Sequence, residues 1–102
     1  MFLIQFLIPL YDNDNQPFPK NAFDQICNEM TDRFGGVTTF LRSPAKGVWK
    51  ECNGKVNHDE VVMFEVMADG LDRRWWTGYR KELERRFRQE ELIIRSMGME
   101  RL

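Results

Sequence analysis

Residues 2–10, FLIQFLIPL, are apolar on both of the faces that a β-strand would present. A strand of this kind must be covered on both sides, and residues 60–68, EVVMFEVMA, have the same character. The first ten residues are too few to cross a bilayer and have neither a basic stretch nor a small-residue cleavage site, so we interpret them as a strand rather than a signal peptide. The chain therefore predicts a sheet whose interior strands are residues 2–10 and 60–68.

Two further segments have the 3.6-residue period of amphipathic helices. The apolar stripe of the first consists of Phe23, Ile26, Met30 and Phe34. We expect Asn21 to cap this helix and Gly35-Gly36 to end it. The stripe of the second, which follows Asp72 as N-cap, consists of Trp76, Tyr79, Leu83 and Phe87.

Residues 37–42 and 91–97 read as short strands, which completes the order βαββαβ. Right-handed crossovers turn this order into a ferredoxin-like α+β fold, a four-stranded antiparallel sheet with both helices on one face. The first and third strands of that fold are interior, in agreement with the two segments that are apolar on both sides. A chain of 102 residues is expected to form one such domain.

The connection between the second and third strands predicts a hairpin arm that extends past the sheet. Asn53-Gly54 has the chemistry of a two-residue turn, which would place Trp49 opposite His58. Pro44 and Gly47 would bend an edge strand at this point rather than end it.

The same turn predicts the register of the two strands. If the pairing continues without a bulge, Arg42 faces Glu65 and Leu41 faces Val66, which pairs opposite charges and two apolar side chains. One extra residue in a bulge would move every pair to the other face.

The face of the sheet without helices is expected to be mainly apolar. Its predicted residues are Leu3, Gln5, Leu7, Phe40, Arg42, Val61, Met63, Glu65 and Met67. Large contiguous apolar patches usually mark interfaces, so we expect a homodimer joined through this face or through the hairpin arm. The alternative is a monomer whose arm folds back over its own sheet.

The polar residues of that face form the candidate ligand site: Gln5, Arg42 and Glu65, with Arg95 from the last strand and Trp49 from the arm. In the functional interpretation, arginine orients an anionic or carbonyl-bearing small molecule and Glu65 acts as a base. In the structural interpretation, Arg42 and Glu65 satisfy each other, because buried polar groups need partners.

His58 is the only histidine and stands beside Asp59 and Glu60. It is a candidate general base, with a solvated turn residue as the alternative. Together with Cys52 and Asp59 it does not match the spacing of a zinc site, so we expect no metal and no cofactor. Cys27 and Cys52 lie far apart and outside any CxxC pattern, which favours free thiols in a cytoplasmic protein.

Residues 72–91, DRRWWTGYRKELERRFRQEE, combine arginines with aromatic side chains, as nucleic-acid-binding proteins do. The aromatic residues belong to the buried stripe and the basic residues are interleaved with glutamates, so we expect a salt-bridged outer face and no nucleic-acid binding. Trp75 lies off the stripe and is expected to pack at an edge or against a partner. Gly78 costs about 1 kcal/mol relative to alanine in a helix, which predicts that another group approaches closely there.

Two segments, GVWKECNGKVNHDE (residues 47–60) and YRKELERRFRQEELIIR (79–95), resemble those of a small family of uncharacterised proteins, a conserved domain of unknown function. The first gives G-x-W, N-G and then an acidic residue before a strand. The second gives Y-R-x-x-L-E-x-x-F-x-Q-E. The resemblance implies a ferredoxin-like fold and no established activity. More distantly, the layout is similar to the dimeric α+β barrel proteins, several of which are cofactor-free enzymes acting on small ligands.

Three functions follow as hypotheses. The first is a dimeric binding or accessory module. The second is a cofactor-independent enzyme that uses Glu65 or His58 as base and Arg42 as electrostatic partner. The third is a nucleic-acid-associated regulator.

Overall fold

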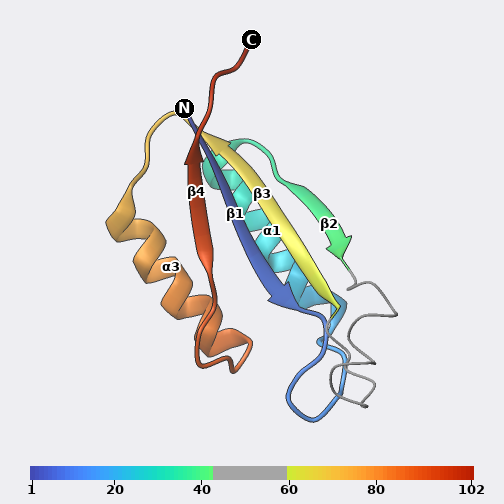
Figure 1. Ribbon diagram of the computed structural model, residues 1–102. Helices are drawn as coiled ribbons and strands as arrows, with labels where there is room; N and C mark the ends of the chain where they lie inside the picture. Colours follow the sequence, from blue (N-terminus) through green and yellow to red (C-terminus); the bar gives the residue numbers. More distant parts are fainter. Residues whose placement is uncertain (43–59) are drawn as a thin grey trace, which may run out of the picture.

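The structure is a computed structural model that describes residues 1–42 and 60–102. Its elements are β1 (Phe2–Pro9), α1 (Lys20–Phe34), β2 (Thr38–Arg42), β3 (Val61–Ala68), α3 (Arg73–Arg86) and β4 (Ile94–Gly98). The strands form a four-stranded sheet in the order β2-β3-β1-β4, in which every neighbouring pair is antiparallel. The ferredoxin-like fold predicted from the sequence is confirmed, with β1 and β3 in the interior of the sheet (Figure 1).

The hydrophobic core lies between the sheet and both helices, which cover the same face (Figure 1). The core side chains from β1 and β3 are Ile4, Phe6, Ile8, Phe64 and Val66, and those from the helices are Ile26, Met30, Trp76, Tyr79 and Leu83. Phe6 and Phe64, which are cross-strand partners, stack with their ring centroids 5.1 Å apart. Phe6 also contacts Trp76 and Tyr79 of α3, at centroid distances of 6.0 and 6.1 Å.

Two of the predicted helix ends are confirmed. Gly35 ends α1 in the left-handed conformation, with φ of 83°, and its N–H donates to the carbonyl of Thr31 at 2.9 Å. Asp72 caps α3, because its Oδ1 accepts a hydrogen bond from the N–H of Trp75 at 3.0 Å.

The predicted start of the first helix is wrong. The helix begins at Lys20, after Pro19, so Asn21 lies inside its first turn and does not cap it. The chain is fixed just before this point by Phe18, whose ring lies 4.9 Å from that of Phe87. The fixed φ of Pro19 is compatible with entry into a helix, so no side-chain cap is needed to direct the chain.

The last strand begins at Ile94 and not at residue 91 as predicted. The residues before it are used to turn the chain, beginning at Arg88, which has φ of 50°. The N–H of Leu92 donates to Oε2 of Glu84 at 2.9 Å, and the Leu92 side chain is buried in the core. This segment therefore anchors the turn and leaves fewer residues for the strand.

The predicted register of the second and third strands is also wrong. Glu65 pairs with Thr38, Val62 with Leu41 and Val61 with Arg42. The shift is an even number of residues, so every side chain keeps the face that alternation requires, and burial does not distinguish the two registers. The predicted arm, with its Asn53-Gly54 turn and its bend at Pro44 and Gly47, lies outside the described residues.

Candidate functional site

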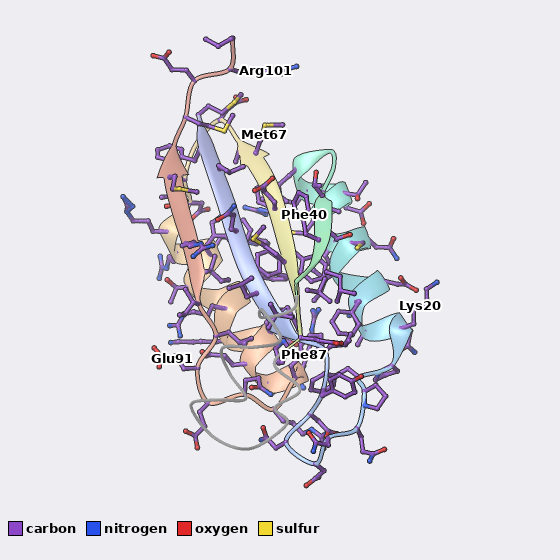
Figure 2. The ribbon with its side chains drawn as sticks, turned by 45° about the vertical axis from the view of Figure 1, so that its right-hand side comes forward. Lys20, Phe40, Met67, Phe87, Glu91 and Arg101 are labelled. Atoms are coloured by element: carbon purple, nitrogen blue, oxygen red, sulfur yellow. The ribbon has the colours of Figure 1, made fainter. Side chains whose placement is uncertain are left out.

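The helix-free face of the sheet carries the odd-numbered side chains of β1 and β3, as predicted. Its members in β1, β3 and β4 are Leu3, Gln5, Leu7, Val61, Met63, Glu65, Met67, Arg95 and Met97. Phe40 of β2 belongs to the same face, because it pairs with Met63. Figure 2 shows Phe40 and Met67 projecting from their strands. Among the side chains of this face that the structure describes in β1, β3 and β4, the polar ones form one row across its middle.

We name this set the Gln5 row: Glu65 of β3, Gln5 of β1 and Arg95 of β4, which are cross-strand partners. The Gln5 Nε2 donates to Glu65 Oε1 at 2.7 Å, and Arg95 Nε donates to Gln5 Oε1 at 3.0 Å. Gln5 is only 9% exposed, so both ends of its amide are satisfied where water has little access. The row therefore joins an acid to a base through a neutral amide.

The candidate site predicted from the sequence is brought together only in part. Gln5, Glu65 and Arg95 are in contact, whereas the backbone of Arg42 pairs with Val61 rather than with Glu65. Trp49, His58 and the side chain of Arg42 lie outside the part of the chain that the structure describes. The ligand-binding and catalytic roles of all these residues stay predictions.

A pocket of about 830 Å³ lies at the end of the sheet where β3 leads into α3, and we name it the end pocket. It is lined by Met1, Arg33, Phe34, Met67, Ala68, Asp69, Gly70, Leu71, Asp72, Trp76 and Arg101. Its volume lies within the range of roughly 300–1,000 Å³ that small-molecule sites occupy. The sequence analysis missed this pocket, because its walls come from both ends of the chain and from the ends of three elements.

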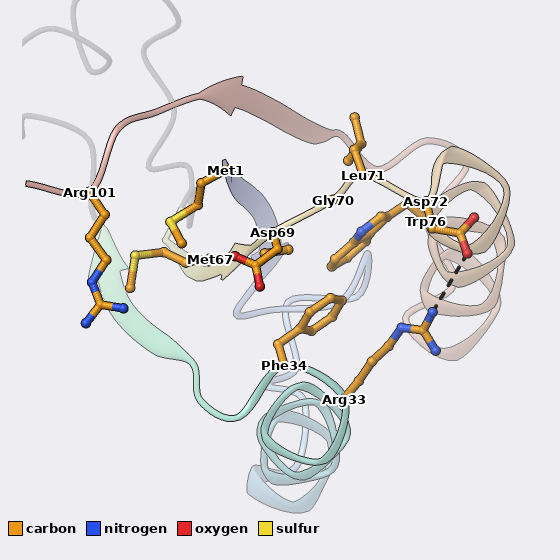
Figure 3. Close-up of a pocket in the computed structure, with 11 residues that line it drawn as sticks. Met1, Arg33, Phe34, Met67, Asp69, Gly70, Leu71, Asp72, Trp76 and Arg101 are labelled. Atoms are coloured by element: carbon orange, nitrogen blue, oxygen red, sulfur yellow. Dashed lines mark ion pairs between the residues drawn. The ribbon is translucent and has the colours of Figure 1, made fainter.

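The walls of the end pocket combine aromatic rings with charges of both signs (Figure 3). Phe34 and Trp76 stack with centroids 5.3 Å apart and planes 13° from parallel. Figure 3 shows the Asp69 carboxylate between Met67 and Phe34, with Arg101 on the far side of Met67. A ligand with an apolar middle part and a charged group at each end would match the side chains of such a pocket.

The charges of the end pocket differ in how far they are already neutralised. Arg33 lies 3.9 Å from Asp72, and its guanidinium stands 4.0 Å from the centroid of the Trp75 ring. Asp69 and Arg101, in contrast, make no ion pair or side-chain hydrogen bond with any residue in 1–42 or 60–102. These two side chains are the ones available to a charged ligand.

A second charged cluster connects the two helices. Arg86 of α3 donates to both carboxylate oxygens of Glu29 on α1, at 2.5 and 2.7 Å, and the Tyr79 hydroxyl donates to Glu29 Oε1 at 3.0 Å. Hydrogen bonds from Arg86 lower the pKa of Glu29, while burial raises the pKa of the Tyr79 hydroxyl. Each group is paired within the cluster, so we interpret it as a structural connection between helices.

The outer face of α3 is salt-bridged, as predicted. Arg80 pairs with Glu84 at 3.1 Å, and Glu82 pairs with both Arg85 and Arg86. The expectation that the protein does not bind nucleic acid stays a prediction.

The predictions for two other residues of α3 have different outcomes. Trp75, predicted to lie at an edge, stacks on Tyr79 and packs against Phe34 of α1, at centroid distances of 5.0 and 5.7 Å. The close approach predicted at Gly78 is wrong, since a Cβ placed there would meet no atom within 4 Å.

Among residues 1–42 and 60–102, no group of three or more His, Cys, Asp or Glu side chains is arranged to hold a metal ion. Cys52, His58 and Asp59, weighed as metal ligands from the sequence, are outside those ranges. Cys27 is a free thiol whose pKa is raised by burial. No helix in the described part of the chain has the length and apolar character needed to cross a membrane.

Comparison with known proteins supports the fold. No known protein family and no curated protein matches the sequence, so the resemblance to an uncharacterised family stays a prediction. A solved structure with a similar fold is a phage SAM lyase in complex with S-methyl-5′-thioadenosine. The two chains are 17% identical, with a TM-score of 0.54 over 94% of this chain and 79% of the lyase chain. At this level of identity the likeness shows the fold alone.

Proposed function

We propose that this protein binds a small zwitterionic molecule in the end pocket, and that the ligand class is an adenosine thioether or sulfonium such as S-adenosylmethionine (SAM). The single observation that carries the proposal is the presence of Asp69 and Arg101, unpaired among the described residues, on the walls of a pocket that also contains Phe34. The similar fold of a protein named as a SAM lyase supports the choice of ligand class.

The chemistry of SAM suits the lining of the pocket. A carboxylate on the ligand matches the fork of donors on Arg101, and a positively charged ammonium or sulfonium matches Asp69. The adenine and ribose would lie against Phe34 and Met67, since aromatic rings and flexible thioethers suit flat apolar groups. The carboxylate of the ligand and one of its two positive groups would then have charged partners, as partly buried charges require.

Ligand binding is tested by isothermal titration of the full chain with SAM and, separately, with S-methyl-5′-thioadenosine, which lacks the amino-acid charges. Arg101→Gln should weaken SAM binding about tenfold, equivalent to about 1.4 kcal/mol, and leave binding of the thioadenosine within about twofold. Asp69→Asn should behave in the same way. No heat of binding for either compound at millimolar concentration would overturn the proposal.

The matched control is Asp32→Asn, which makes the same change of charge at an exposed position of α1 outside the pocket. It should leave both affinities unchanged. Loss of SAM binding in this control would mean that overall charge, and not the pocket, determines the result.

The enzymatic hypothesis is separated from simple binding by a product assay. If the protein is a cofactor-independent enzyme of this ligand class, incubation with SAM should release S-methyl-5′-thioadenosine faster than buffer does, as measured by chromatography. Binding without product favours the binding or accessory module. Catalysis by Glu65 would require a different site, because Glu65 is held by Gln5 and is not among the described residues that line the end pocket. His58 and the side chain of Arg42 lie outside the described part of the chain.

The cytoplasmic location expected from the cysteines is part of this proposal. A protein that uses a cytoplasmic metabolite and carries the free thiol of Cys27 would work in a reducing compartment. Localisation of a tagged full-length chain by microscopy would test this expectation.

A further inference from the structure

Several apolar side chains on the helix-free face are exposed to solvent in the single chain. The exposed fractions are 42% for Phe40, 53% for Met67 and 46% for Met97. They come from β2, β3 and β4, whereas Met63 and Gln5 on the same face are only 5% and 9% exposed. Figure 2 labels Phe40 and Met67 on their strands. Exposed apolar side chains gathered on one sheet face are the kind of surface that binds another protein.

The Gln5 row makes this face asymmetric in charge from one edge of the sheet to the other. Acidic Glu65 lies on one side of Gln5 and basic Arg95 on the other, each one strand away. Neither charged side chain has used all of its hydrogen-bonding groups: within the described residues, Glu65 bonds through Oε1 and Arg95 through Nε. The second carboxylate oxygen and the terminal guanidinium nitrogens can therefore bind a partner that offers the opposite order of charges.

A second copy of the same chain offers that order for one orientation of the two-fold axis. When two identical sheets pack face to face, the two-fold axis lies in the plane between them, and its two limiting directions are along the strands and across them. An axis along β1 exchanges the two sides of the row, so that Glu65 of each copy faces Arg95 of the other. An axis across the strands would place Glu65 on Glu65 and Arg95 on Arg95, which is repulsive.

The apolar residues next to the row agree with the first orientation. Leu3 pairs with Met67 on one side and with Met97 on the other, so the three form a level parallel to the Gln5 row. An axis along β1 would place Met67 of each copy on Met97 of the other, and Leu3 on Leu3. Flexible thioethers of equal length adapt well to one another.

We propose that the helix-free face binds a second copy of this chain about a two-fold axis parallel to β1, with two symmetric Glu65–Arg95 ion pairs between the copies. The inference does not rest on ligand binding in the end pocket. The two interior strands have eight residues each and the two edge strands five each. At a spacing of about 4.8 Å they give a flat face of roughly 400 Å² on each copy, which is small for a stable interface, so the dimer should be weak and form at roughly tens of micromolar.

The first test is sedimentation equilibrium of the wild-type chain and Glu65→Gln, from about 1 to 200 µM in low salt. The substitution keeps an acceptor for Gln5 and removes only the charge. It should weaken the dimer about fivefold or more and reduce its sensitivity to salt. A tighter dimer would show that Glu65 faces Glu65 and would overturn the proposed axis. A wild-type chain that stays monomeric over the whole concentration range would overturn the interface. The apolar helix-free face would then be explained by a segment of the same chain that covers it.

The second test is complementation between two charge-reversed chains, Glu65→Arg and Arg95→Glu. Each alone places like charges on opposite copies and should be monomeric, whereas an equimolar mixture should dimerise at least as tightly as wild type. The Gln5 amide can flip, or can use one of its groups to hydrogen-bond both neighbouring side chains, so neither charge-reversed chain needs to lose its fold. Thermal unfolding followed by circular dichroism checks that both chains are folded. Failure of the mixture to dimerise while both chains are folded would overturn the ion pairs. Glu90→Gln, at an exposed position after α3, is the control and should leave the association unchanged.

Discussion

On the helix-covered face of the sheet, Phe6 and Phe64 are at most 1% exposed, whereas Phe40 and Met67 on the opposite face are 42% and 53% exposed. The side chains on the two faces are of similar type, and the difference lies in what covers them. Two helices seal one face within the chain. The other face has a hydrogen-bonded polar row at its centre. Of the apolar groups around it, Phe40, Met67 and Met97 are exposed, while Met63 is only 5% exposed. Equal hydrophobicity along a strand therefore predicts that both sides need cover, but it does not say from where the cover comes.

The largest expected effect is on the helix-covered face. Phe64→Ala removes a ring that stacks on Phe6 in a sealed core, and it should lower the free energy of unfolding by about 3–5 kcal/mol. Urea denaturation at low micromolar protein concentration measures the change.

The same substitution on the other face provides the matched comparison. Phe40→Ala should cost less than about 1 kcal/mol in the single chain, because its ring is already exposed to solvent. If the two substitutions destabilise the chain equally at low concentration, the two faces are equally sealed and the comparison fails.

A smaller effect is expected where the helices are held together over the core. Glu29→Gln removes the charge that binds Arg86, and it should cost about 2 kcal/mol at neutral pH. Arg86 lowers the pKa of Glu29, so its contribution is complete above the ordinary carboxyl value of about 4.3 and is lost as the pH falls through the lowered pKa. Unfolding measured from pH 7 down to pH 3 should therefore show the wild type and the variant converging in acid. A difference that stays constant would assign the effect to packing, and Asp32→Asn, exposed on the same helix, should show no such convergence.

The Gln5 row should contribute less to the stability of one chain. Gln5→Leu removes the hydrogen bonds to Glu65 and Arg95, but both partners have access to water, so the expected loss is about 1 kcal/mol. Chemical denaturation measures this loss, with Gln25→Leu at an exposed site on α1 as control. A loss as large as that of Phe64→Ala would mean that the row is as important to folding as the core.

The smallest effect should be a gain. Gly78 lies on the exposed side of α3 with open space around its Cα, so Gly78→Ala should stabilise the chain by about 0.5–1 kcal/mol. The midpoint of thermal unfolding should rise by a few degrees. A decrease would show that the exposed side of α3 is in contact with another group after all, as the sequence first indicated.

The sequence predicted the fold because the spacing of apolar residues along each strand and helix indicates which face of that element is buried. The spacing of two residues between Phe6 and Ile8 predicted that both face the core from one strand, and the helical spacing of Trp76 and Leu83 predicted the same for one helix. All four side chains are buried in the core. The start of α1 was missed because it is fixed by Phe18, whose packing against Phe87 depends on the tertiary structure. Register was missed for a related reason, since alternation determines the face of a residue but not its partner.

The site was predictable only where its members share a face. Gln5, Glu65 and Arg95 stood out as polar residues on strands that are otherwise apolar, and the structure brings them together. The end pocket has no such signal, because Arg33, Asp69 and Arg101 look like ordinary surface residues until the fold places them around one space. The one available hint was the acidic turn at Asp69 and Asp72, between a buried strand and a helix.

The aromatic pair beside the end pocket gives the protein an optical reporter of its own. Trp76 lines the pocket, and the indole of Trp75 lies against it with centroids 4.8 Å apart. Indole emission responds to nearby charge and polarity, so a molecule that enters the pocket should shift the emission spectrum without any added label. The chain has three tryptophans, and Trp49→Phe would leave these two as its only indole groups. Binding of compounds to the end pocket could then be screened by tryptophan fluorescence without a label.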